Sequence, residues 1–218
     1  MTKPLIPADE ARRLETLQNL KLLDTPPEER FDRVTRLARR VFGVPVAILS
    51  LVDKDRQWFK SRQGLETIET PREISFCGHA ITGDQVLVVT DAVHDERFND
   101  NPLVTREPNV RFYAGCPITA PDTSKIGALG IIDREPRELS DEDLVLLRDM
   151  GRMVEEELAT TNPSTNDAAT GLSNRRGLSL IGQHLLTMCR RVRHPASLLV
   201  IRFANLANID ESFGYSEG

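Results

Sequence analysis

The chain has 218 residues and a net charge of −5, which allows one domain of ordinary size and part of a second. The acidic balance argues against nucleic acid as a partner. No stretch approaches the roughly 18 apolar residues that span a bilayer, and the N-terminus lacks the apolar core of a signal peptide. The three cysteines are far apart, a spacing typical of reduced thiols rather than of disulfides or a metal site. We therefore expect a soluble, cytoplasmic protein that binds no membrane, no nucleic acid and no metal.

Two helices are predicted near the N-terminus. Leucines at helical spacing occupy residues 9–23, and a second apolar stripe runs through residues 31–41. Between them, Thr25 precedes two prolines and two acids, an order typical of a helix start with Thr25 as its cap. Gly43 is expected to end the second helix.

Strand-forming residues dominate the middle of the chain. Residues 44–52 and 56–61 are predicted to pair as a hairpin, and residues 85–89 form a third strand. A second hairpin joins residues 111–119 to residues 125–133. This order predicts an α+β domain in which helices pack on one face of a mainly antiparallel sheet.

A long helix is predicted from residue 140 to about residue 161. Ser140 is a suitable N-cap and three acids follow it. One face of this helix can cover the domain's own sheet and the other a partner helix, although both could equally be buried within one chain. We predict a homodimer in which the following residues form the dimer helix: Leu144, Leu147, Gly151, Val154 and Leu158.

Four segments resemble the GAF sensor domains of bacteria. They read NLKLLDTPPEERFD from residue 19, LVDKDRQWFK from residue 51, SFCGHAI from residue 75 and VRFYAGCPI from residue 110. The resemblance covers roughly residues 5–160 and implies a six-stranded antiparallel sheet with helices packed on it, a ligand cavity on one side, and helices that pair in a dimer. GAF domains as a class bind cyclic nucleotides, tetrapyrroles, small metabolites or no known ligand. The resemblance therefore leaves the small-molecule ligand and any cofactor unknown.

Several residues of these segments are candidates for lining the implied cavity, although each also has an ordinary structural explanation. Trp58 and Phe59 are neighbours on a strand, so they point to opposite faces. Cys77 could be activated by His79 only if a loop brings the two together, because side chains two apart on a helix diverge. The candidate ligand-binding residues are Trp58, Phe59, Cys77, His79, Asp91, Arg97, Phe112 and Cys116.

Structural roles are the preferred explanation for most of these candidates. Asp91 and Arg97 belong to a polar loop, where such residues contact ligands or cap turns. Cys116 precedes a proline in a strand and suits a small buried apolar position. A pairing of Cys77 with Cys116, as a methionine-sulfoxide-reducing GAF enzyme would need, is a minor alternative.

The final block resembles the beginning of a GGDEF (diguanylate cyclase) domain. It opens with DAATGLSNRR at residue 167 and ends with FGYSEG at residue 213. Aligned on Gly214, the positions at which the resemblance implies metal-binding aspartates hold Arg202 and Ala204. An arginine there would repel the Mg²⁺ that phosphoryl transfer requires. We therefore predict a GAF domain over residues 1–160, a linker over 161–166, and a truncated, degenerate α/β GGDEF-like segment over 167–218 without catalytic residues.

These features predict a signal-transduction sensor rather than an enzyme. In this interpretation the GAF domain detects a small molecule or a redox cue, and the helix at residues 140–161 passes its state to an inactive GGDEF-like output. The alternative is an N-terminal fragment of a cyclic-di-GMP-metabolising enzyme whose gene continues into a phosphodiesterase domain. A third, weaker hypothesis is an enzyme that acts through Cys77.

Overall fold

The computed structural model describes residues 1–160 and a few isolated positions between residues 172 and 199. The chain divides into two compact units, Met1–Ser164 and Thr165–Gly218. The predicted linker and the predicted GGDEF-like segment fall almost entirely outside the described residues. Their boundaries stay predictions, and the fold below is that of the first unit.

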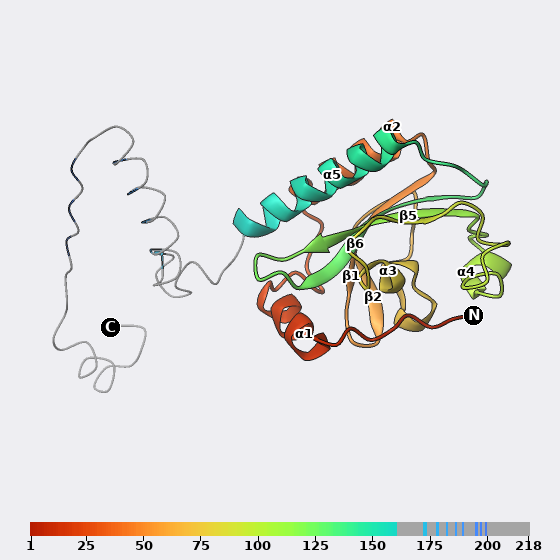
Figure 1. Ribbon diagram of the computed structural model, residues 1–218, viewed down its shortest axis with the longest axis horizontal. Coiled ribbons are helices and arrows are strands. Elements are labelled where there is room, and N and C mark those ends of the chain that lie inside the picture. Colours follow the sequence, from red (N-terminus) through yellow and green to blue (C-terminus); the bar gives the residue numbers. More distant parts are fainter. Residues whose placement is uncertain are drawn as a thin grey trace. The chain divides into compact units, whose positions relative to one another are not determined.

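A six-stranded antiparallel sheet forms the centre of this unit (Figure 1). Its strands are β1 (Val46–Val52), β2 (Arg56–Gln63), β3 (Glu69–Pro71), β4 (Leu87–Val89), β5 (Phe112–Thr119) and β6 (Lys125–Asp133). They lie in the order β3-β2-β1-β6-β5-β4, so the two predicted hairpins meet where β1 pairs with β6. The six-stranded sheet is confirmed. The strand pattern missed β3 because it is three residues long and ends in proline.

Helices cover both faces of the sheet. They are α1 (Glu10–Asn19), α2 (Glu29–Val41), α3 (Phe76–Ala80), α4 (Pro102–Thr105) and α5 (Asp141–Thr160), with a short 3₁₀ turn, η1 (Arg72–Ile74). Figure 1 shows α2 and α5 side by side on one face and α3 on the other. The prediction that helices pack on one face was wrong. All seven residues of β1 are buried, and a strand that is apolar on both sides needs a cover on each.

The two faces hold separate hydrophobic cores. The helix-pair core lies on the α2 and α5 side and includes Leu49, Phe112 and Leu147. The α3-side core lies on the opposite face and includes Ile48, Phe59 and Tyr113. Neighbouring residues of one strand thus belong to different cores, as the two-residue period of a strand requires.

The starts of the two longer helices differ from one another. At α5 the cap is as predicted: the Ser140 hydroxyl accepts the Asp143 amide at 3.2 Å, and the Asp143 carboxylate accepts the Ser140 amide at 3.0 Å. At α2 the predicted cap was wrong. The Thr25 hydroxyl donates to the Leu22 carbonyl oxygen at 2.6 Å and accepts from Lys60 Nζ at 2.6 Å, so it is engaged elsewhere.

The predicted dimer helix is anchored in its own domain. Leu147, Val154 and Leu158 are buried in the helix-pair core, and Leu144 is half-buried. A Cβ atom added to Gly151 would lie 2.8 Å from Cys116 Sγ, so the glycine lets α5 sit directly on β5. Because these buried side chains face the sheet, they do not form the partner-facing surface that the spacing suggested. The exposed large apolar side chains of α5 are instead Val145, Leu146 and Met153.

Candidate functional site

The resemblance to GAF domains implies a ligand cavity on one side of the sheet and does not specify which. The face beneath α3 is one of the two, and Tyr113 lies across it. The Tyr113 hydroxyl donates to Cys77 Sγ at 3.2 Å. A Cβ atom added to Gly115 would lie 2.0 Å from that hydroxyl, and one added to Gly130 would lie 3.2 Å from the ring. Glycines in β5 and β6 therefore make the room that the tyrosine ring occupies.

Further aromatic rings complete this layer. Phe76 stacks on Phe98 with ring centroids 4.1 Å apart and lies 5.1 Å from the Tyr113 ring. The first turn of α3 is fixed by Ser75, whose hydroxyl accepts the Gly78 amide at 2.7 Å. Side chains of the α3-side core thus occupy the space between α3 and the sheet, and this face is closely packed in this conformation.

Cys77 is a protonated core thiol. Its side chain is almost fully buried, and burial raises its pKa to about 11, although the Tyr113 hydroxyl acts to lower it. His79 lies on the same short helix but points toward the N-terminal segment, where Nε2 lies 3.1 Å from the Thr2 carbonyl oxygen. Partial burial lowers the pKa of His79. The geometry gives no activated thiol–imidazole pair.

The predicted ligand-binding candidates do not gather in one place. Phe59 and Cys77 belong to the α3-side core, whereas Trp58, Phe112 and Cys116 belong to the helix-pair core on the opposite face. Since the sheet separates the two thiols, Cys77 and Cys116 do not form the redox pair considered above. Burial raises the pKa of Cys116 to about 11 as well.

The polar loop after β4 is held by its own side chains. The Asp91 carboxylate accepts the Val93 amide at 3.1 Å and lies 2.7 Å from His94 Nδ1. Arg97 forms an ion pair with Asp95 at 2.6 Å. Asp91 and Arg97 therefore have local partners, which supports turn capping as the role of Asp91 and a local ion pair as the role of Arg97.

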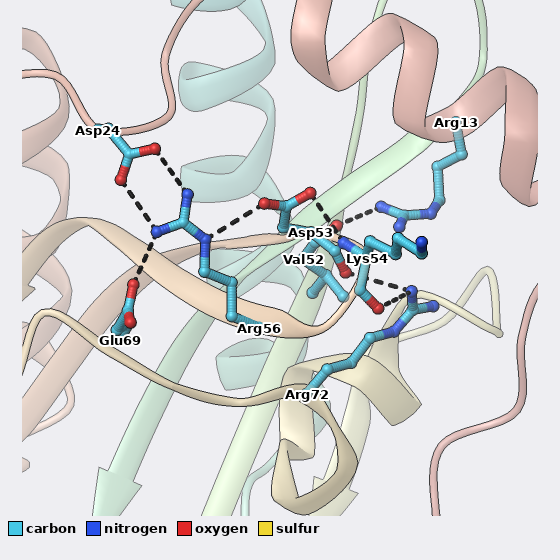
Figure 2. Close-up of polar contacts among 8 residues, drawn as sticks. All are labelled: Arg13, Asp24, Val52, Asp53, Lys54, Arg56, Glu69 and Arg72. Carbon is cyan, nitrogen blue, oxygen red and sulfur yellow. Dashed lines mark hydrogen bonds and ion pairs between the residues drawn. The ribbon is translucent and has the colours of Figure 1, made fainter.

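Three arginines converge on the turn between β1 and β2 (Figure 2). Arg13 of α1 is 1% exposed and donates to the Val52 carbonyl oxygen at 2.5 Å. Arg72 donates to the carbonyl oxygens of Asp53 and Lys54, both at 3.2 Å. These charge-assisted bonds satisfy backbone oxygens where the chain reverses.

Carboxylates compensate the charge of these arginines. Partial burial acts to raise the pKa of Glu10, but hydrogen bonds from Arg13 and Arg72 outweigh it and lower the pKa to about 2. Arg56 lies between Asp24 and Glu69 (Figure 2). Its Nη2 atom is 2.6 Å from Asp24 Oδ2, and its Nη1 atom is 2.7 Å from Glu69 Oε2. The motif residues around the turn thus bind one another. No local pattern indicated that the distant helix α1 would supply Glu10 and Arg13.

Lys60 is another buried polar residue that the sequence patterns did not single out. The Lys60 side chain has 0% exposure and pairs with Glu28 at 2.5 Å. It also donates to the Pro26 carbonyl oxygen at 2.9 Å and lies 6.0 Å from the centre of the Trp58 ring. Lys60 lies two residues after Trp58 on a buried strand, so the two side chains point to the same face. This spacing was the sequence signal for a buried lysine. Lys60 fixes the segment that leads into α2.

Among the described helices, none combines the length and the apolar composition needed to cross a bilayer. This finding agrees with the absence of a long apolar run in the sequence.

A relative and two solved structures share features with this chain. A cyclic di-GMP phosphodiesterase of Pseudomonas aeruginosa is 42% identical over 178 residues, which cover 80% of this chain and 30% of that protein. The free methionine-R-sulfoxide reductase of Neisseria meningitidis aligns with a TM-score of 0.51 at 17% identity, over 74% of this chain and 96% of that one. The GAF domain of an Acinetobacter phosphoenolpyruvate-protein phosphotransferase aligns with a TM-score of 0.50 at 16% identity, over 68% of this chain and 94% of that one.

These comparisons agree on the architecture. At such low identities the two structures show a common fold and carry nothing about ligand or reaction. The chain spans about 30% of the length of the curated relative that it matches. The activity named for that relative is therefore a property of the full-length phosphodiesterase. The family model of the GAF domain matches residues 26–158, which is more than half of the chain and contains all six strands. This chain belongs to the GAF domain family.

Proposed function

We propose that this chain is the sensor module of a longer cyclic-di-GMP signalling protein. The observation that carries this proposal is the 42% identity to a cyclic di-GMP phosphodiesterase. The alignment covers 80% of this chain, which is more than the 160 residues predicted for the GAF domain, so the similarity extends beyond that domain. The output in this proposal is a phosphodiesterase domain encoded downstream, reached through the degenerate GGDEF-like segment.

In this proposal α5 is the element that carries the signal. Leu147, near its start, and Leu158, near its end, are both buried in the helix-pair core, so the helix follows the sheet over most of its length. Gly151 brings the helix backbone against Cys116 of β5. A change in the packing of the sheet would therefore shift the end of α5, from which the chain leaves the domain.

The chain alone is proposed to have no catalytic activity. Among the described residues, Cys77 and Cys116 are buried thiols whose pKa values are raised to about 11, which argues against a cysteine nucleophile. Arg202 and Ala204, the positions on which the cyclase argument rests, lie outside the described residues. We expect purified protein to form no cyclic di-GMP from GTP.

The proposed partner is a second copy of the chain. The helices α2 and α5 contact each other and leave large apolar side chains exposed at Val41, Leu146 and Met153. Paired helices of two copies would cover these side chains. The proposed location is the cytoplasm, where the free thiols would stay reduced. Light scattering on a concentrated sample tests the dimer, and a strict monomer would contradict it.

The signalling role is tested by changing the contact beneath α5 in the full-length gene product. Gly151→Ala places a methyl group 2.8 Å from Cys116 Sγ, whereas Gly83→Ala makes the same chemical change where nothing lies within 4 Å. We expect the rate of cyclic di-GMP hydrolysis to change at least about twofold for Gly151→Ala and to stay constant for Gly83→Ala. A full-length product that does not hydrolyse cyclic di-GMP, or equal rates for all three proteins, would refute the proposal.

A further inference from the structure

An open groove of about 660 Å³ runs along α2, on the side of the sheet opposite the α3-side core. Four arginines of one helix dominate its lining. The residues around it are Arg33, Arg36, Arg39, Arg40, Leu37, Gly43, Val44 and Gln63. The groove is thus a basic surface on an acidic chain, and its volume lies within the range of about 300–1,000 Å³ that small-molecule sites occupy.

Two of the four arginines lack a compensating charge. Arg36 pairs with Glu29 at 2.5 Å, and Arg33 pairs with Glu157 of α5. Among the described residues, neither Arg39 nor Arg40 has a carboxylate partner. Basic residues in the last turn of a helix are favoured by its dipole. This explains the positions of Arg39 and Arg40 but does not explain the groove beside them. Two unpaired guanidinium groups in a groove favour an anion with two charges.

The remaining lining suits a planar base. Gly43 has φ +59 and ends α2, and a Cβ atom added there would meet nothing within 4 Å, so this end of the groove is open. Leu37 is 41% exposed and offers an apolar surface beside the arginines. The Gln63 side-chain amide can both donate and accept hydrogen bonds. A ligand with phosphates and a flat, polar-edged ring matches these groups.

We propose that this groove binds a nucleotide with two negative charges, with Arg39 and Arg40 holding its phosphates. A guanidinium group binds two phosphate oxygens at once and can bind guanine O6 and N7 in the same way. Cyclic di-GMP carries two phosphodiester groups and two guanines, so it is the first probe. In naming the ligand class, this inference rests on the proposed role in cyclic-di-GMP signalling.

The groove is also connected to α5. The Arg33 side chain hydrogen-bonds Glu157 Oε1, and Arg30 Nη1 donates to the Glu157 carbonyl oxygen at 3.3 Å. An anion beside Arg33 competes with the Glu157 carboxylate for this guanidinium group. Occupation of the groove therefore loosens a contact near the end of the helix that leaves the domain.

Binding to the 218-residue chain by calorimetry tests the site, with cyclic di-GMP, GTP and inorganic pyrophosphate as probes. We expect cyclic di-GMP to bind and the double variant Arg39→Ala, Arg40→Ala to weaken its binding at least about tenfold. The matched control is Arg12→Ala, Arg106→Ala, which removes two exposed arginines away from the groove and should change affinity less than about twofold. Glu157→Gln should strengthen binding, because it removes the competitor of Arg33.

Four results would overturn the site: no nucleotide binding with a Kd below about 1 mM, unchanged affinity in the Arg39/Arg40 double variant, an equal loss in the control, or pyrophosphate binding as tight as that of nucleotides. Unchanged or weaker binding in Glu157→Gln would overturn its connection to α5. The two proposals fail separately. Nucleotide binding here without cyclic di-GMP hydrolysis by the full-length product refutes only the proposed function. Hydrolysis that responds to Gly151→Ala without nucleotide binding refutes only this site.

Discussion

The position of Tyr113 over the sheet can be tested at Gly115. In Gly115→Ala the new Cβ atom would lie 2.0 Å from the Tyr113 hydroxyl oxygen and 2.5 Å from Cζ, so the ring must move by more than 1 Å. The ring is 1% exposed and lies against Phe76, which leaves it no free direction. Overpacking of this kind costs about 1–3 kcal/mol, and loss of the hydrogen bond to Cys77 adds about 1 kcal/mol. We expect a destabilisation of about 2–4 kcal/mol.

Urea unfolding followed by fluorescence measures this cost, because Trp58 is the single tryptophan and is buried. The decisive comparison is a double-mutant cycle. In a Tyr113→Leu background the clash is absent, and Gly115→Ala should cost less than about 1 kcal/mol. Gly83→Ala, which meets open space, is the control and should shift the free energy of unfolding by less than about 0.5 kcal/mol.

Equal costs of Gly115→Ala in the two backgrounds would refute the reasoning. They would mean that Tyr113 does not lie over Gly115 and that the space under α3 is filled in another way. The face beneath α3 would then need a new description, because the packed aromatic layer depends on this ring.

Three further expectations concern buried polar groups and thiols. The pKa of Glu10 is depressed in the folded protein, so its stabilisation is complete above about pH 4.5 and is lost as the pH falls toward about 2. The stability deficit of Glu10→Gln should therefore be about 2 kcal/mol near neutral pH and shrink in acid; a deficit independent of pH would contradict this. Lys60→Ala removes the buried partner of Glu28 and should cost about 2–4 kcal/mol in urea unfolding, whereas a cost under about 1 kcal/mol would contradict the buried contacts. Cys77 and Cys116 should resist a thiol reagent in the native state and react in denaturant; rapid labelling of either native thiol would show that it is accessible.

Most of the fold could be predicted from the sequence because its signals are local. Apolar strands, the turn between β1 and β2, and the Ser140 cap of α5 each depend on residues close together in the chain. The pattern failed for β3 and α3, which are too short to show a period. It also failed at Thr25, because the Thr25 hydroxyl accepts a hydrogen bond from Lys60 of β2 and does not cap the helix.

The candidate site was less predictable, because the type of a residue does not determine which face of the sheet its side chain occupies. Cys77 and His79 are two apart in the chain, yet one points into a core and the other toward the N-terminal segment. Cys77 and Cys116 are both buried thiols, but a sheet lies between them. Which face a residue occupies follows from strand register, and register depends on pairing with distant strands.

The sequence by itself determined the family, five of the six strands and the long helix at the end of the domain, since motifs and periodic patterns depend on neighbouring residues. Only the tertiary structure decided that the Leu147–Leu158 face of α5 is buried in its own domain. Only it showed that Tyr113 fills the space beneath α3, and that arginines of α2 border an open groove. The physical reason is that burial and charge compensation are properties of surfaces, which form when segments far apart in the chain come into contact.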